Sequence, residues 1–293
     1  MLELHTEQYS DSAGITCVEK AFLLIAELKG KDYRKYFYES FIEFDEVFSD
    51  FLYNDYAYLN YLKIPRLQNV AVELGEVQMQ SFQSDSISAL KYLETNLIKQ
   101  NPALAMVELQ VDNEIFRPWR DDHFILLYAF DGQFIRYLND YPLEVSKISK
   151  EEFEENYKNL LLIFDILKTE YKGYMSIVEE KIVGLKCTKD ITTRDYTIES
   201  ETVPRIRDAC GLLKILRRRT CDWLKYLQEM YEYNLKDELF RLLQDEIHLL
   251  NKLYTYLEFQ NLRKKYKNAE TNEIIKNIKN HEKQWRMLLA KEV

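Results

Sequence analysis

Cys17 is the residue whose type and position best fit nucleophilic chemistry. Thr16 is a suitable N-cap for the helix predicted by the segment CVEKAFLLIAELKG, and Glu19 completes a capping box. Cys17 is therefore expected in the first helical turn, where unpaired N–H groups and the helix dipole favour a thiolate. The other three cysteines have no base nearby in the sequence and are interpreted as structural: Cys187, Cys210 and Cys221.

A nucleophilic thiol needs a base, and His123 is the best placed of the four histidines. It begins an apolar segment, residues 123–130, and the dipeptide AspGly at 131–132 predicts a tight hairpin leading into a second strand at 133–138. Paired residues of such a hairpin lie about 4.5 to 5.5 Å apart. Asn139 and Asp140, which end the second strand, are therefore expected beside His123, where either could orient the imidazole.

The elements that must position these side chains change in kind along the chain. Apolar residues at helical spacing predict helices in residues 17–30, 40–62 and 84–99. Apolar or alternating runs then predict strands at 102–111, 123–130, 133–138 and 160–166, with Ser149 capping a short helix before the last one. This order predicts an α+β domain with an antiparallel sheet over residues 1–167.

The remainder of the chain, residues 168–293, predicts a helical domain. Residues 205–233, 236–267 and 271–291 carry large apolar side chains at three- and four-residue spacing. From Lys168 onward there are 25 basic and 20 acidic residues, a net charge of +5, whereas residues 1–167 carry −14. An acidic first half would repel a phosphate backbone, so no nucleic-acid partner is expected. The run RRR at 217–219 is either a docking patch for an acidic partner or a solvated face.

Composition and motifs exclude several classes of function. There is no CxxC pair, no histidine at zinc-ligand spacing, and no GxGxxG or GxxxxGK[ST] loop, so neither a metal nor a cofactor is expected. No apolar run approaches the roughly 20 residues of a membrane span. The first 14 residues lack the pattern of a signal peptide, which makes the cytoplasm the expected compartment.

A resemblance to a known family becomes visible at this point. Cys17, His123 and Asn139 match the papain-like order of a helix Cys, a strand His, and an Asn or Asp on the next strand. The stretches NPALAMVELQVD and HFILLYAFDGQFIRYLNDYP resemble the N-terminal domain of the butirosin BtrH-type acyltransferase family, over about residues 8–167. The chain is also similar to the peptidase domains of bacteriocin-exporting transporters. The resemblance implies a papain-like cysteine-protease fold, followed here by an all-α helical bundle domain.

The resemblance also implies an activity and its residues. In the BtrH-type family an acyl group passes from a carrier protein's phosphopantetheine arm to an amine of a specialised, antibiotic-like metabolite. Carried over, Cys17 would be the nucleophile and His123 the base, and Gln8 would donate to the oxyanion. Asn139 is preferred as the orienting residue, with Asp140 as the alternative. The implied partners are an acyl carrier protein or another acyl thioester and a small-molecule amine, and the helical domain offers a surface for a homodimer.

Two other functions remain open at this stage. The same three side chains could serve a papain-like cysteine peptidase or amide hydrolase, or the fold could be a catalytically silent binding module. A cysteine in an amphipathic helix is most often a core residue, and His123 could be a hydrogen-bonded polar residue at a strand start. The tyrosine-rich residues 33–61 could line an acyl pocket or pack in a core.

Overall fold

The computed structural model describes residues 14–54, 61, 63–111, 119–140, 143–185 and 195–292. Their contacts divide the chain into two compact units. The first combines the described parts of Met1–Tyr33 and Arg66–Glu170, and the second combines those of Arg34–Pro65 and Tyr171–Val293. The predicted division into 1–167 and 168–293 has one boundary along the chain, whereas the two contact units have three, after Tyr33, after Pro65 and after Glu170.

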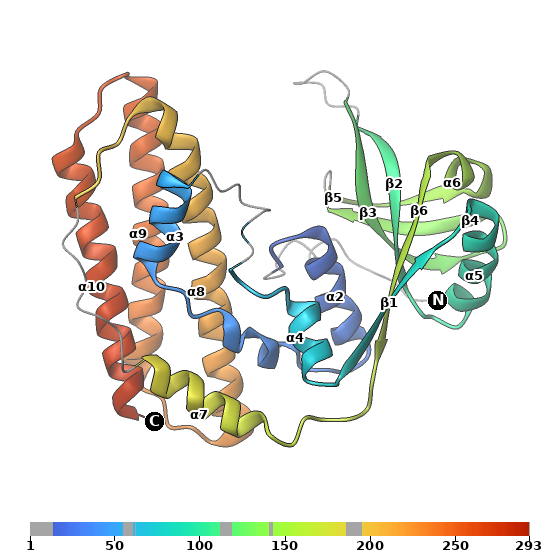
Figure 1. The fold of residues 1–293 in the computed structure, drawn as a ribbon, viewed down its shortest axis with the longest axis horizontal. Coiled ribbons are helices and arrows are strands. Elements are labelled where there is room, and N and C mark those ends of the chain that lie inside the picture. The colour runs from blue at the N-terminus through green and yellow to red at the C-terminus, as the bar shows by residue number, and fades with distance from the viewer. Residues whose placement is uncertain are drawn as a thin grey trace. The chain divides into compact units, whose positions relative to one another are not determined.

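Six strands form an antiparallel sheet in the first unit, in the spatial order β1-β6-β2-β3-β4-β5 (Figure 1). The strands are β1 (Val77–Gln83), β2 (Ala103–Val111), β3 (Trp119–Phe130), β4 (Phe134–Asp140), β5 (Leu143–Ser149) and β6 (Tyr157–Ile166). The helices of this unit are α2 (Cys17–Leu28), α4 (Leu67–Glu73), α5 (Ser86–Ile98) and α6 (Lys150–Asn156).

Helices cover both faces of this sheet. Adjacent residues of a strand point to opposite faces, and β6 shows the two environments. Ile163 belongs to the core that the sheet forms with α5 and α6, whereas Phe164 contacts Phe22 of α2 with ring centroids 5.5 Å apart. Figure 1 shows α2 and α5 on different sides of the strands. The sheet face opposite α5 therefore carries the helix that begins at Cys17.

The fold class is confirmed at the level of an α+β half followed by a helical region. The four predicted strands correspond to β2, β3, β4 and β6, and the predicted helix at 84–99 corresponds to α5. The β3–β4 connection is longer than predicted: it spans residues 131–133, where Asp131 Oδ1 accepts from the N–H groups of Gln133 and Phe134 and Gly132 has a φ of +100°. The two edge strands, β1 and β5, were not predicted.

Three long helices dominate the second unit: α8 (Val203–Tyr231), α9 (Asp237–Leu262) and α10 (Asn268–Glu292). They match the three helical ranges predicted from the sequence. Two shorter helices, α3 (Phe44–Tyr53) and α7 (Tyr174–Leu185), and the 3-10 segments η1 (Tyr33–Glu39) and η3 (Ser200–Thr202) complete the secondary structure described there. Within the described ranges, no helix combines the length and the apolar composition that crossing a membrane requires.

The aromatic residues of 33–61 that the structure describes are mostly core residues of the second unit. Tyr36, Phe37, Phe44, Phe48, Phe51 and Tyr61 are each at most 1% exposed. Phe44 stacks on Phe48, and Phe48 makes an edge contact with Tyr196. This favours the core-packing interpretation of the tyrosine-rich segment over an acyl pocket.

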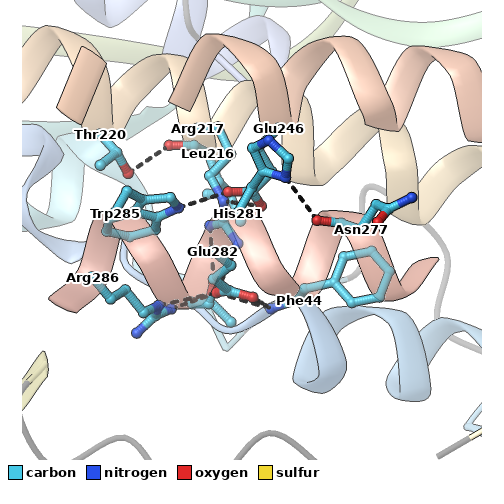
Figure 2. Close-up of polar contacts among 11 residues, drawn as sticks. Phe44, Leu216, Arg217, Thr220, Glu246, Asn277, His281, Glu282, Trp285 and Arg286 are labelled. Carbon is cyan, nitrogen blue, oxygen red and sulfur yellow. Dashed lines mark hydrogen bonds and ion pairs between the residues drawn. The ribbon is translucent and has the colours of Figure 1, made fainter. Parts of the chain in front are cut away.

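A buried ionic network attaches the start of α3 to the three long helices (Figure 2). Arg217 of α8 donates to Glu246 of α9 at 2.6 Å, to Glu282 of α10 at 2.9 Å and to the carbonyl oxygen of Ile42 at 3.0 Å. Glu282 also accepts from the backbone N–H of Phe44, at 3.0 Å. Charged and backbone groups that are buried together here therefore satisfy one another.

The structure also corrects the interpretation of the RRR run at 217–219. Arg217 and Arg219 are 0% exposed, so these two residues form neither a solvated face nor a docking patch. Arg218 alone of the three is exposed. The sequence carries no sign of this burial, because the glutamates that pair with Arg217 are 29 and 65 residues away from it.

Candidate active site

The N-terminus of α2 is held by polar contacts on both sides of Cys17. The Thr16 hydroxyl accepts from the backbone N–H of Glu19 at 3.2 Å, as the N-cap prediction requires. The Glu19 carboxylate departs from the predicted capping box: it accepts from the N–H of Ile15 at 2.7 Å and from the N–H of Leu67, which begins α4, at 3.0 Å. Glu19 is 0% exposed. Its carboxylate thus ties the residues before Cys17 to a second helix.

The Cys17 sulfur lies against strand β3. The backbone N–H groups of Phe124 and Val18 donate to it, and Phe124 is the residue that follows His123. Cys17 is partly exposed, whereas Cys210 and Cys221 are buried. Of the cysteines that the structure describes, Cys17 alone combines partial exposure with a helix N-terminus and a neighbouring histidine-bearing strand.

His123 and Asp140 form a direct pair. The distance between His123 Nε2 and Asp140 Oδ1 is 2.5 Å, and the two side chains are 24% and 12% exposed. Because Asn139 and Asp140 are adjacent in β4, their side chains point to opposite faces of the sheet. Of the two residues predicted to orient His123, Asp140 makes the contact in this structure, whereas Asn139, the preferred one, is 0% exposed.

A fourth side chain, Lys20, completes the cluster. Lys20 lies one helical turn after Cys17, and its Nζ is 3.4 Å from Asp140 Oδ2. Asp140 therefore engages His123 with one oxygen and Lys20 with the other. Lys20 was not predicted from the sequence, although residues three apart on a helix share a face and this spacing could have identified it.

The charges of the cluster act on two pKa values. Burial raises the pKa of the Cys17 thiol and the Asp140 charge adds to this, while the two N–H donors and Lys20 act in the opposite direction. Burial would also raise the pKa of Asp140, but the hydrogen bond and charge of His123, together with Lys20, hold that pKa below its usual value. Asp140 is therefore an anion at neutral pH.

Not every residue singled out in the sequence is among those that the structure describes. Gln8 and Cys187 lie outside the described residues. His281 binds the carbonyl oxygen of Asn277 in the helical unit. Within the part of the chain that the structure describes, no group of three or more His, Cys, Asp or Glu side chains is placed to hold a metal ion.

The arrangement provides a thiol, an imidazole paired with a carboxylate, and backbone N–H groups at the sulfur. These are the elements of nucleophilic catalysis by a cysteine. Comparison with models of known protein families gave no match, and neither did comparison with curated proteins.

Proposed function

We propose that this chain is a cysteine-dependent acyltransferase, in which Cys17 takes an acyl group from a thioester and passes it to an amine. One observation carries the proposal. The Cys17 sulfur accepts a hydrogen bond from the backbone N–H of Phe124, the residue after His123, and His123 is paired with Asp140. The likeness to the BtrH-type family supports the same chemistry and suggests an acyl carrier protein as donor and a specialised metabolite as acceptor. It also suggests a papain-like fold for the sheet unit.

The His123–Asp140 contact supports one arrangement of protons for the proposed first step. When Nε2–H donates to Asp140, the neutral ring keeps its lone pair on Nδ1. Nδ1 would take the proton of the Cys17 thiol, and the sulfur would attack the thioester carbonyl. The carbonyl carbon then forms a bond to Cys17 Sγ and loses its bond to the donor sulfur, which leaves as a thiol with the proton from Nδ1. The Cys17 backbone N–H is the proposed oxyanion donor.

In the second step, an amine attacks the acyl group on Cys17. Nδ1 of His123 would accept the proton of the amine, and the Cys17 sulfur would leave, restoring the thiol. Thioester exchange onto cysteine is nearly isoenergetic, so the first step costs little, whereas amide formation makes the second step favourable. Exclusion of water decides between transfer and hydrolysis.

The test is a covalent adduct. Wild-type protein mixed with an acyl N-acetylcysteamine thioester is expected to gain the mass of one acyl group by intact-protein mass spectrometry. Cys17→Ala should gain none, and Cys221→Ala, which removes a buried cysteine of the helical unit, should react like wild type. His123→Ala should slow adduct formation by about 100-fold or more, since general bases contribute that much. An adduct that persists in Cys17→Ala would remove Cys17 from the mechanism.

The fate of the adduct separates transfer from hydrolysis. An amide product that forms only when a primary amine is added supports the acyltransferase. Release of the free acid at the same rate with and without amine, or cleavage of a peptide in the absence of amine, would instead establish the alternative of a cysteine hydrolase or peptidase.

One observation favours a binding module instead. Burial raises the pKa of the Cys17 thiol, and a protonated thiol is a weak nucleophile. In the acyltransferase, proton transfer to Nδ1 creates an imidazolium whose charge stabilises the thiolate. Labelling of Cys17 by iodoacetamide distinguishes the two: the enzyme should show a pH midpoint below the ordinary value of about 8.5, and a catalytically silent module should show a midpoint at or above that value.

A further inference from the structure

The Cys17 site contains one more negative charge than an arrangement with a neutral orienting amide. An asparagine at the position of Asp140 would hold the imidazole without a charge, whereas the Asp140 carboxylate is an anion. That anion stabilises an imidazolium on His123. It also opposes a thiolate on Cys17, because like charges in a partly buried site disfavour ionisation.

Lys20 lies where it can compensate for this charge. Its Nζ is 3.4 Å from Asp140 Oδ2, on the oxygen that His123 does not use, and the Lys20 side chain is 27% exposed. Lys20 and Cys17 belong to the same turn of α2, so the ammonium group faces the carboxylate from the element that carries the sulfur. With Lys20 present, the state with a thiolate on Cys17 and an imidazolium on His123 carries no net charge within the group of four side chains.

The backbone around Lys20 is tightly packed. A Cβ added to Gly14 would lie 2.6 Å from both the backbone nitrogen and Cγ of Lys20. The chain before Cys17 therefore passes directly over Lys20, and only glycine fits there without a shift. Glu19 is the other charged residue of this turn, and its carboxylate accepts hydrogen bonds from the N–H groups of Ile15 and Leu67.

We propose that Lys20 is a positioning residue of the Cys17 site, which orients Asp140 toward His123 and cancels its charge toward the sulfur. This inference rests on the proposed function. The charged or titratable groups assigned to the site are Cys17 and Lys20 from α2, His123 from β3 and Asp140 from β4. Glu144 of β5, the strand paired with β4, hydrogen-bonds with Tyr137.

The experiment measures the pH profile of Cys17 alkylation by iodoacetamide in the full-length protein, followed by mass spectrometry. Lys20→Met should move the midpoint upward by at least about 0.5 pH unit, because a nearby positive charge is lost from a partly exposed position. At a fixed pH below the midpoint this is about a threefold loss of thiolate, and acyl-adduct formation should slow accordingly. Lys20→Arg, which keeps the charge, should retain the wild-type midpoint.

Two comparisons separate positioning from a merely structural role. Lys29→Met makes the same substitution at the C-terminal end of α2, where Lys29 contacts Gln100 and Asn101, and it should leave the midpoint unchanged. In an Asp140→Asn background, Lys20→Met should give a smaller shift than in wild type, because the carboxylate that holds Lys20 near the sulfur is gone and only the direct effect of the Lys20 charge remains. Circular dichroism confirms that each variant is folded.

The outcomes are distinct from those that test the proposed function. The role of Lys20 would be overturned if the pH profile of Lys20→Met superimposed on that of wild type. It would also be overturned if Lys20→Met shifted the midpoint as much in the Asp140→Asn background as in the wild-type protein. The midpoint can be measured whether or not an acyl adduct forms. A Lys20-dependent shift of the midpoint without any acyl adduct would therefore refute the acyltransferase proposal and still support charge compensation by Lys20.

Discussion

At the scale of single residues, the sequence limited the partner of His123 to two adjacent residues but could not choose between them. The hairpin spacing predicted that Asn139 or Asp140 would meet His123, and Asp140 does. The choice depends on register, since a shift of one residue moves every side chain to the other face. Here the register shifts between Leu127 and Ala129, and the turn spans residues 131–133. Neither feature has a signal in the residue pattern.

Asp140 gives a prediction for stability against pH. Its pKa in the folded protein lies below the usual value, because His123 and Lys20 together outweigh the effect of burial. A carboxylate of this kind stabilises the folded state fully above its unfolded pKa of about 4, and this contribution is lost as the pH falls through the folded pKa. Asp140→Asn should therefore lower the free energy of unfolding at pH 7, and the difference from wild type should shrink below pH of about 4.

Urea unfolding at a series of pH values measures this difference. Asp208→Asn is the matched control, since Asp208 pairs with Arg207 at an exposed position of α8. Exposed pairs contribute only about 0 to 1 kcal/mol, so the control should show little change at any pH. A difference for Asp140→Asn that is the same at pH 3 and pH 7 would contradict the assigned pKa direction.

At the scale of elements, the sequence predicted the helix and strands with long apolar runs and missed the two edge strands of the sheet. The helix at Cys17 and the central strands β2, β3 and β6 have long apolar runs, and each was predicted. Strand β1 reads VQMQSFQ, and every residue after Val77 is exposed. Strand β5 buries only Ile148. An edge strand pairs on one side only and packs little, so its sequence carries a weak pattern.

The buried network of Figure 2 gives a prediction for the helices. Arg217→Met should lower the free energy of unfolding by about 3 to 5 kcal/mol, because it leaves the Glu246 carboxylate buried without a cation, whereas Glu282 keeps its pair with Arg286. Chemical denaturation measures the loss. Arg241→Met makes the same substitution in the exposed pair with Glu238 on α9 and should cost less than about 1 kcal/mol.

A second variant tests the physical reason. Replacing Glu246 by Leu in the Arg217→Met background removes one unpaired charge and should recover part of the loss. Equal effects of Arg217→Met and Arg241→Met would show that the network contributes no more than a surface ion pair.

At the scale of the whole molecule, the chain passes between its two compact units three times: after Tyr33, after Pro65 and after Glu170. The first two crossings were not predicted, because the aromatic residues of 34–65 suit the core of either unit. Their assignment depends on distant partners such as Arg217 and Glu282, which contact Ile42 and Phe44. Composition and periodicity within the segment carry no information about those partners.

This interleaving predicts how fragments behave. Residues 1–170 produced alone should aggregate, because they include α3 without α8 and expose Phe44, Phe48 and Phe51, which are 0% exposed in the intact chain. Coexpression with residues 171–293 as a separate polypeptide should give a soluble complex that elutes as one species in size-exclusion chromatography. In the control fragment, a flexible linker replaces residues 34–65 within 1–170, and this fragment should be soluble without the second polypeptide. Aggregation of residues 1–170, of the coexpressed pair and of the control fragment alike would contradict the two-unit division.

The placement of α3 also constrains how such a gene can be shortened or recombined. A single break after residue 170 would leave one product with an aromatic helix that belongs to the interior of the other. Neither half can be exchanged as a cassette at one junction. A viable recombinant that swaps the helical half must carry residues 34–65 along with it, which requires three joins in the coding sequence.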